Sequence, residues 1–314
     1  MVIRELHKTH PIVKGQAGTQ EGGCSAALNK LASQHPCFAL GKPNNKGRIH
    51  LPVSPGCNIA CRFCERSINA YEQRPGVTAE VIRPDEVVEL VGEAVALAPE
   101  LTVVGIAGPG DTLATPYAIE TFRLVKEQFP QLLRCMSTNG LLLEDRIEEL
   151  VEVGVDTLTV TVNEVDPTRL VQINDYVVYE GRQYRGIEAA ELLISKQLAG
   201  IRAAAARGLM IKVNTVLVPG INDRRIGVIA QTVKAAGAGL YNLIPLIPNA
   251  QMSRLAAPTC AQIDAARSDA EAHIAVFRHC QHCRADAIGV PGGKDYGDQI
   301  WRRRVSQANT FSHG

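Results

Sequence analysis

Three cysteines lie close together in the chain, in the run CNIACRFC that spans residues 57–64. Cys57, Cys61 and Cys64 are spaced four and three residues apart, in a loop that follows a strand-like segment. Three thiolates at this spacing can each bind one iron of a cubane 4Fe-4S cluster, and the fourth iron is left free to chelate S-adenosylmethionine. Electron transfer into the chelated cofactor breaks a carbon–sulfur bond and gives a deoxyadenosyl radical. The triplet therefore predicts a radical enzyme that depends on S-adenosylmethionine.

A zinc site is the alternative interpretation of the triplet. Zinc requires a fourth ligand in a structural site, and paired C-x-x-C knuckles are its more usual arrangement. The position of the triplet directly after a predicted strand favours the cluster instead, because the sites of barrel enzymes gather at the carboxyl ends of the strands.

The other cysteines also need an explanation, because the chain has nine in all. A reducing compartment disfavours disulfides, so metal ligation or catalysis is the better use. We place the C-x-x-C pair Cys280 and Cys283 at the end of a long helix, which favours metal ligation, since a redox dithiol usually opens one. Cys135 alternates with Arg134 and Met136 in a predicted strand, so its thiol is expected to point into a barrel, with a small core residue as the alternative.

The predicted elements explain how such distant residues could meet. Short apolar, β-branched runs alternate with helical patterns, which predicts parallel strands with right-handed crossovers. The predicted strands are Leu51–Ser54, Leu101–Ala107, Leu132–Ser137, Thr157–Val162, Met210–Leu217 and Leu240–Ile247. The predicted helices are Pro84–Ala98, Pro116–Phe129, Glu144–Val153, Ile187–Arg207, Arg225–Ala236 and Thr259–Arg278. Six βα units are too few to close an eight-stranded barrel, so the expected α/β fold is an open, partial TIM-like barrel.

We divide the chain into an N-terminal arm over residues 1–48, a barrel over 49–289 and a C-terminal tail over 290–314. The arm shows little periodicity apart from a short helix near Ala26–Ala32, yet it carries Cys24 and Cys37 outside any plausible core segment. We expect Glu164–Gly186 to be a long loop that could cover the site as a lid, and the tail to be irregular.

Composition excludes several partners. The chain of 314 residues has 33 basic and 32 acidic side chains and a net charge of +1, so it has no overall field for nucleic acid or an anionic membrane. It contains no apolar run of membrane-spanning length and no signal-like apolar stretch at its start. We therefore expect a globular, cytoplasmic protein.

Small and polar residues follow the predicted strands, where a cofactor would bind. The glycines of Gly105–Asp111 permit close approach of the backbone to a ligand, although turn and capping chemistry explains each polar residue equally well. The candidates for binding S-adenosylmethionine are Gly108, Gly110, Asp111, Ser137, Asn139, Asn163 and Asn214.

Seven segments, taken in order, resemble the NifB family of radical S-adenosylmethionine (radical SAM) proteins of nitrogenase cofactor biosynthesis. They are His35–Cys37, Arg48–Val53, Cys57–Cys64, Arg74–Val77, Gly105–Asp111, Ser137–Gly140 and Cys283–Ala287. The resemblance implies an enzyme that fuses two 4Fe-4S clusters into an 8Fe-9S cluster with a central carbide, the precursor of the iron-molybdenum cofactor. It also implies that one S-adenosylmethionine donates a methyl group to a cluster sulfide, and that a second supplies the radical that removes hydrogen from this methyl.

The resemblance further implies the ligands. Cys57, Cys61 and Cys64 would bind the radical SAM cluster. One substrate cluster would be bound by Cys37, His50 and Cys135, and the other by Cys24, Cys280 and Cys283. His50 would be a labile ligand through a neutral imidazole, with a packed histidine as the alternative. Glu72 would be a labile ligand or a catalytic proton acceptor, with a surface carboxylate as the equal alternative. Cys260 receives no role, and we expect a thiol packed within a helix.

The chain departs from the family pattern in two places. Pro43, Asn44 and Asn45 stand where the family commonly has adjacent histidines, and the end at Gly314 leaves no room for the C-terminal carrier domain of longer members. The implied partners are therefore separate cofactor carrier or scaffold proteins, a ferredoxin or flavodoxin electron donor, and a donor of iron-sulfur clusters. The alternatives are another radical SAM enzyme that acts on a small molecule or peptide with an auxiliary cluster on Cys280 and Cys283, or a non-catalytic iron-sulfur carrier.

Overall fold

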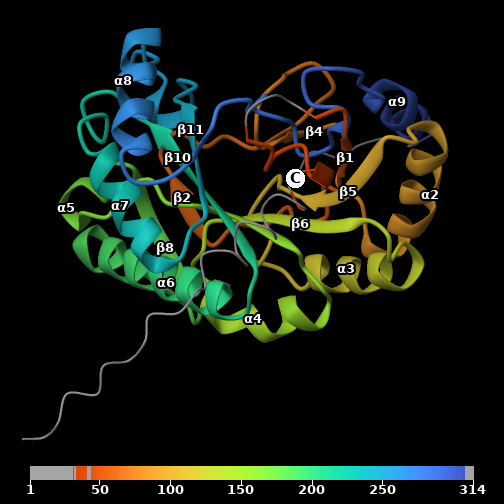
Figure 1. The fold of residues 1–314 in the computed structure, drawn as a ribbon, viewed down its shortest axis with the longest axis horizontal. Coiled ribbons are helices and arrows are strands. Elements are labelled where there is room, and N and C mark those ends of the chain that lie inside the picture. Colours follow the sequence, from red (N-terminus) through yellow and green to blue (C-terminus); the bar gives the residue numbers. More distant parts are fainter. Residues whose placement is uncertain (1–30, 32, 41–43, 308–314) are drawn as a thin grey trace, which may run out of the picture.

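The computed structural model describes residue 31, residues 33–40 and residues 44–307. Its centre is a curved eight-stranded sheet (Figure 1). The strands lie in the order β12, β11, β10, β7, β6, β5, β1, β13, and all neighbours are parallel except β1 and β13. Their bounds are β1 Gly47–His50, β5 Leu101–Ile106, β6 Leu133–Thr138, β7 Thr157–Thr161, β10 Met210–Leu217, β11 Leu240–Pro245, β12 Val276–Phe277 and β13 Ile288–Gly289. The edge strands β12 and β13 do not pair with each other, so the open, partial barrel expected from the sequence is confirmed.

Helices cover the outer, convex face of this sheet (Figure 1). The helices of the described residues are η1 Pro84–Glu86, α2 Val87–Leu97, α3 Tyr117–Gln128, α4 Leu143–Glu152, α5 Pro167–Leu170, α6 Gly186–Ala206, α7 Ile226–Ala236, η2 Ala250–Met252, α8 Cys260–Glu271 and α9 Gly297–Gln307. None of the helices in the described ranges combines the length and apolar character needed to cross a bilayer.

The alternation of side chains along the strands separates the core from the site. In β7, Leu158 and Val160 are fully buried in the main apolar core, whereas Thr159 and Thr161 line a cavity on the other face. Successive side chains of a strand point to opposite faces of the sheet, so one face of β7 packs on helices and the other faces the cavity. The concave face is therefore the place where side chains from many strands can meet.

Two small sheets stand beside the barrel. Strand β2 (Ile59–Cys61) pairs antiparallel with β8 (Asn174–Tyr179), and β8 pairs antiparallel with β9 (Arg182–Arg185). Strand β3 (Ser67–Ile68) pairs with β4 (Val77–Thr78). The pairing of β2 with β8 places Cys61 opposite Asn174 and fixes the cysteine triplet against the hairpin.

Four expectations about the elements are wrong. The first strand is Gly47–His50 and not Leu51–Ser54, because residues 47–50 pair with β5 and β13, whereas Ser54 forms only an isolated bridge. Glu164–Gly186 is not a long loop, because β8 and β9 form a hairpin whose buried residues pack against α6. The tail contains α9, in which Ile300 and Trp301 are buried in the main core.

The fourth error concerns the last long helix. Helix α8 ends at Glu271, because Ile274, Val276 and Phe277 turn inward and Val276–Phe277 pairs with β11. The Cys280 and Cys283 pair consequently lies in a segment without regular structure and does not close a helix.

Two cysteine expectations can also be assessed here. Cys260 is exposed at the first position of α8, so the expectation of a thiol packed in a helix is wrong. Cys24, and the predicted helix Ala26–Ala32 apart from Leu31, lie outside the described residues.

Candidate functional site

One cavity of about 350 Å³ lies on the concave face of the sheet. The described cysteines and the histidine that were expected to bind iron all line it, and they are Cys37, His50, Cys57, Cys61, Cys64, Cys135, Cys280 and Cys283. They come from the arm, from β1, from the triplet loop, from β6 and from the segment after β12. The fold therefore brings together ligands that are up to about 250 residues apart in the sequence.

The triplet has the donor chemistry that an iron-sulfur cluster requires. Amide groups point at two of its sulfurs: Asn174 Nδ2 lies 3.4 Å from Cys61 Sγ, and Asn139 Nδ2 lies 3.9 Å from Cys57 Sγ. N–H donors to sulfur stabilise the thiolate form and tune a bound cluster. Burial raises the pKa of the Cys57 thiol to about 11, with a smaller contribution from Asp111. The thiol is therefore protonated at neutral pH, and iron binding must displace the proton.

A cluster also fits the spread of these side chains. Within the described ranges, no three His, Cys, Asp or Glu side chains are grouped to hold a single metal ion. A cubane carries several irons, and each thiolate needs to reach only one of them.

His50 is prepared to bind a metal through one defined nitrogen. Its Nδ1 lies 3.0 Å from the carbonyl oxygen of Arg284, and because a carbonyl only accepts, Nδ1 carries the proton and Nε2 keeps its lone pair. Burial and the charge of Arg48 lower the pKa of His50 to about 4, so the ring is neutral. A Cβ at Gly105 would lie 2.9 Å from His50 Cδ2, so the glycine leaves room for the ring. A neutral imidazole oriented by a carbonyl is the usual form of a histidine ligand.

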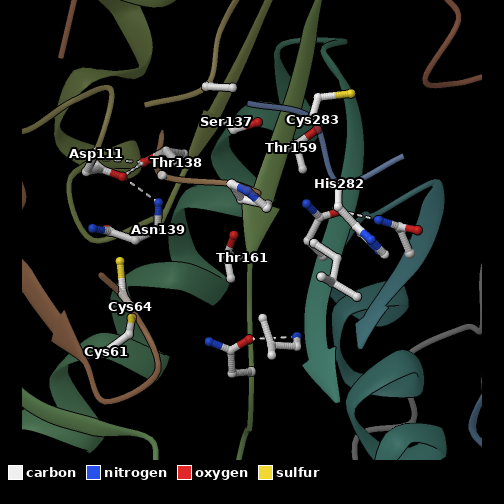
Figure 2. Close-up of a pocket in the computed structure, with 18 of the residues that line it drawn as sticks. Cys61, Cys64, Asp111, Ser137, Thr138, Asn139, Thr159, Thr161, His282 and Cys283 are labelled. Atoms are coloured by element: carbon white, nitrogen blue, oxygen red, sulfur yellow. Dashed lines mark hydrogen bonds between the residues drawn. The ribbon is translucent and has the colours of Figure 1, made fainter. Parts of the chain in front are cut away.

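The remaining ligands are held by neighbouring groups. Cys135 points into the cavity together with Ser137, as the alternation along β6 predicted. Burial raises the pKa of the Cys135 thiol to about 12. Cys283 Sγ accepts a hydrogen bond of 3.1 Å from Arg48 Nη2. Figure 2 shows Cys61 and Cys64 on one side of the cavity and Cys283 on the other, with strand β7 between them.

Most of the residues expected to bind S-adenosylmethionine also line the cavity. They are Gly110, Asp111, Ser137, Asn139, Asn163 and Asn214, whereas Gly108 is not among the lining residues. Asp111 is nearly fully buried and connects two loops, because its Oδ1 accepts from the backbone N–H of Asn139 at 2.6 Å and from Thr138 Oγ1 at 3.0 Å (Figure 2). Asn163 similarly accepts from the Val216 N–H at 2.9 Å. These contacts shape the cavity wall, and direct contact with the cofactor stays a prediction.

Glu72 does not line the cavity. Its Oε2 forms an ion pair of 2.7 Å with Arg74 Nε, and its Oε1 accepts from Asn69 Nδ2 at 2.6 Å. The hydrogen bond from Arg74 lowers the pKa of Glu72, which makes its carboxylate a weaker proton acceptor. Arg74 itself reaches the cavity. The catalytic role of Glu72 remains a prediction.

Three residues of the site were not identified as site residues from the sequence. His35, Arg48 and Lys212 line the cavity and are at most 6% exposed. Lys212 could have been identified from the sequence, because it lies two residues before Asn214 and therefore points to the same face of β10. Buried lysines in an apolar strand are uncommon.

A substitution at Gly110 tests the close packing of the glycine loop. A Cβ at Gly110 would overlap the carbonyl group of Gly56, which is backbone and cannot move aside easily. We expect Gly110→Ala to lower the free energy of unfolding by about 1–3 kcal/mol. Gly92→Ala is the matched control. Gly92 lies within α2, and a Cβ there would come no closer than 3.9 Å to the ring of Phe129. The free energy of unfolding should rise by about 0.5–1 kcal/mol in this variant, because alanine favours a helix more than glycine does. Urea unfolding measures the free energy of unfolding of both variants. Equal values for the two would contradict the close packing of Gly110 against Gly56.

The lowered pKa of His50 predicts a loss of stability in acid. The unfolded chain takes up a proton below about pH 6.5, while folded His50 stays neutral until about pH 4. The stability contributed by His50 is therefore complete above about pH 6.5 and is lost as the pH falls to about 4, by an amount on the order of 3 kcal/mol. Thermal melts of the cluster-free protein at several pH values measure this loss. His50→Asn keeps a donor for the Arg284 carbonyl but does not titrate, so an unchanged pH dependence in this variant would contradict the assignment.

Known proteins resemble this chain over most of its length. The profile of the Radical SAM superfamily matches residues 51–233. The FeMo cofactor biosynthesis protein NifB of Methanocaldococcus infernus is 43% identical over 284 residues, which covers 90% of this chain and 94% of that protein. The protein of the same name from Klebsiella pneumoniae is 39% identical over 269 residues, which covers 83% of this chain and 58% of that protein.

A solved structure resembles the fold. The crystal structure of a radical SAM methyltransferase from Sphaerobacter thermophilus matches with a TM-score of 0.57 and 17% sequence identity, covering 77% of this chain and 70% of that one. At this identity the likeness concerns the architecture of the half-barrel alone.

Proposed function

The chain belongs to the NifB family of the radical SAM superfamily, and from this premise we propose that it builds the iron-sulfur-carbide precursor of the nitrogenase iron-molybdenum cofactor. In this proposal two 4Fe-4S clusters are the substrates, and they are fused into an 8Fe-9S cluster whose central carbon comes from the methyl group of S-adenosylmethionine. The observation that carries the proposal is the convergence of eight candidate ligands on one cavity.

The triplet side of the cavity would hold the radical SAM cluster and S-adenosylmethionine. The cluster, when bound, supplies the electron that cleaves S-adenosylmethionine. The chain supplies Cys57, Cys61 and Cys64 as iron ligands, and Asn174 and Asn139 direct N–H groups at two of these sulfurs. Polar residues at the ends of β6 and β7 and within β10 would orient the cofactor, and these are Ser137, Asn139, Asn163 and Asn214. The cavity walls limit access of water to the reacting atoms.

The opposite side of the cavity would hold the substrates. Cys37, His50 and Cys135 form one ligand set, and Cys280 and Cys283, with Cys24 of the arm as a predicted third ligand, form the other. The two sets would hold their substrates beside the radical source, because both sets and the triplet share one cavity. His50 suits a substrate that must leave, since a neutral imidazole carries no charge and binds iron less tightly than a thiolate does.

Partners follow from this chemistry and are part of the proposal. A ferredoxin or flavodoxin would supply the electrons, an iron-sulfur donor would supply the substrate clusters, and a carrier or scaffold protein of nitrogenase assembly would accept the product.

Counting iron tests the proposed function. After anaerobic reconstitution the chain should bind about twelve irons if it holds three cubanes, and electron paramagnetic resonance of the reduced protein should change when S-adenosylmethionine is added. An iron content of about four to eight per chain would favour a radical SAM enzyme that acts on another substrate with at most one auxiliary cluster. A full iron content without deoxyadenosine formation would favour a carrier without catalysis.

A further inference from the structure

Two cationic side chains are buried in the wall of the cavity, on the side of the expected substrate ligands. Arg48 is 5% exposed and Lys212 is 6% exposed, and both line the cavity. Arg48 Nη1 donates to the Gly289 carbonyl at 2.5 Å, and Nη2 donates to Cys283 Sγ at 3.1 Å. Lys212 Nζ donates to the Cys37 carbonyl at 3.0 Å. Each cation therefore contacts a residue that is expected to bind iron.

Neither cation has a carboxylate partner in the part of the chain that the structure describes. The buried carboxylate of Asp286 is already paired with Arg284, with 2.8 Å between Arg284 Nε and Asp286 Oδ1. The ammonium of Lys212 lies over the rings of Phe38 and Phe277, with 4.9 and 5.1 Å to the ring centres. Among the described residues, Arg48 and Lys212 are consequently two positive charges buried beside the expected iron ligands without a compensating carboxylate.

Unsatisfied donors mark the same wall. Arg48 Nε and His35 Nε2 are buried and have no hydrogen-bond partner among the described residues. His35 Nδ1 accepts from the Cys37 N–H at 3.0 Å, so in the neutral ring the proton is on Nε2. A buried donor or charge without a partner costs free energy, typically about 1–3 kcal/mol for a donor and more for a charge. This cost is recovered when an anion binds against these groups.

We propose that Arg48 and Lys212 are the fixed counter-charges of the substrate clusters, and that they position an anionic, thiolate-bound iron-sulfur cage on this side of the cavity. The inference rests on the proposed function and goes beyond the ligand sets. Thiolates and sulfides are negative, so a cage that is bound through Cys37, Cys135, Cys280 and Cys283 presents negative potential to the wall. Permanent positive charges in the cavity wall stabilise a bound anion. They are already in place, so no reorganisation of the protein is needed when the anion binds.

Lys212→Met and Arg48→Met test the proposal, because methionine keeps an unbranched apolar stem and removes the charge. Lys234→Met is the matched control, since Lys234 is exposed on α7 and the substitution removes the same charge far from the cavity. Three quantities are measured on anaerobically prepared protein: iron per chain after reconstitution, the midpoint potentials of the bound clusters by redox titration with paramagnetic resonance, and the melting temperature of the cluster-free protein.

We expect each cavity variant to lose at least half of the iron that the parent binds beyond the triplet cluster. The potentials of the clusters that remain outside the triplet should shift to more negative values, because a nearby cation stabilises the reduced, more anionic state. The cluster-free variants should melt at the parent temperature or above it, because an unpaired buried charge has been removed. Lys234→Met should leave all three quantities unchanged.

Two outcomes would overturn the counter-charge role alone, and a third would overturn the proposed function together with it. Iron loading and potentials equal to the parent in both cavity variants would overturn the counter-charge role and leave the proposed function intact. A fall in melting temperature of the cluster-free variants that accounts for their iron loss would show that the two residues serve folding only. A parent protein that binds only about four irons would instead overturn the proposed function, and the counter-charge role with it.

Discussion

The Cys57→Ala variant is expected to form no measurable deoxyadenosine, a loss of at least about a thousandfold relative to the parent protein. Cys57 is one of three thiols on the loop that lines the triplet side of the cavity. Two thiolates hold a cubane poorly, and without it no electron reaches S-adenosylmethionine. Deoxyadenosine is measured by chromatography after anaerobic incubation with dithionite and S-adenosylmethionine.

Cys260→Ala is the matched control for this loss. Cys260 is exposed at the start of α8 and does not line the cavity, so this variant should form deoxyadenosine at the parent rate. Retention of deoxyadenosine formation in Cys57→Ala would remove Cys57 from the ligands of the radical SAM cluster.

The Cys283→Ala variant should keep the activity that Cys57→Ala loses first. Cys283 lies across the cavity from the triplet, so cleavage of S-adenosylmethionine should remain within about threefold of the parent rate. Formation of the larger cluster should fall below detection, because one substrate loses a ligand and Arg48 loses the sulfur at 3.1 Å that it contacts. Activation of cofactor-free nitrogenase by the product measures this step.

The two alanine variants should differ in what they retain: Cys57→Ala should lose both activities, because the product requires the radical, whereas Cys283→Ala should lose only formation of the larger cluster. A Cys283→Ala variant that still yields a functional cofactor precursor would contradict the assignment of Cys283. A variant that also loses cleavage of S-adenosylmethionine would show that the two sides of the cavity are not independent.

The barrel strands could be predicted because local pattern and tertiary environment agree there. The runs at Leu101, Thr157 and Met210 are apolar and β-branched, and each pairs in parallel with its neighbours as expected. The hairpin of β8 and β9 could not be predicted in the same way. Strand β9 is largely exposed and reads Arg182-Gln183-Tyr184-Arg185, so its strand structure depends on pairing with β8 and not on an apolar pattern.

The C-terminal end of α8 could not be predicted from the sequence either. Helix α8 has an N-terminal signal in the capping box of Thr259 and Gln262, and its start was predicted at Thr259. Its end at Glu271 has no comparable signal, because the chain leaves the helix in order to bury Ile274 and Phe277 against the sheet. Tertiary packing set this boundary.

For the site, the cysteines and His50 could be named from the sequence because a family pattern and metal chemistry both pointed to them. The cations could not be found in this way. An arginine in a short strand gives no signal, and a lysine in an apolar strand indicates only an unusual position; the structure is needed to show that Arg48 and Lys212 face one cavity without carboxylate partners among the described residues. The lack of a nearby carboxylate can be recognised only from the three-dimensional structure.

Anomalous diffraction at the iron absorption edge, from crystals of the anaerobically reconstituted protein, tests the central claim most directly. The claim predicts three iron centres within the one cavity: one at Cys57, Cys61 and Cys64, one at Cys37, His50 and Cys135, and one at Cys280 and Cys283. Iron found only at the triplet, with the other cysteines free in fully reconstituted protein, would contradict it.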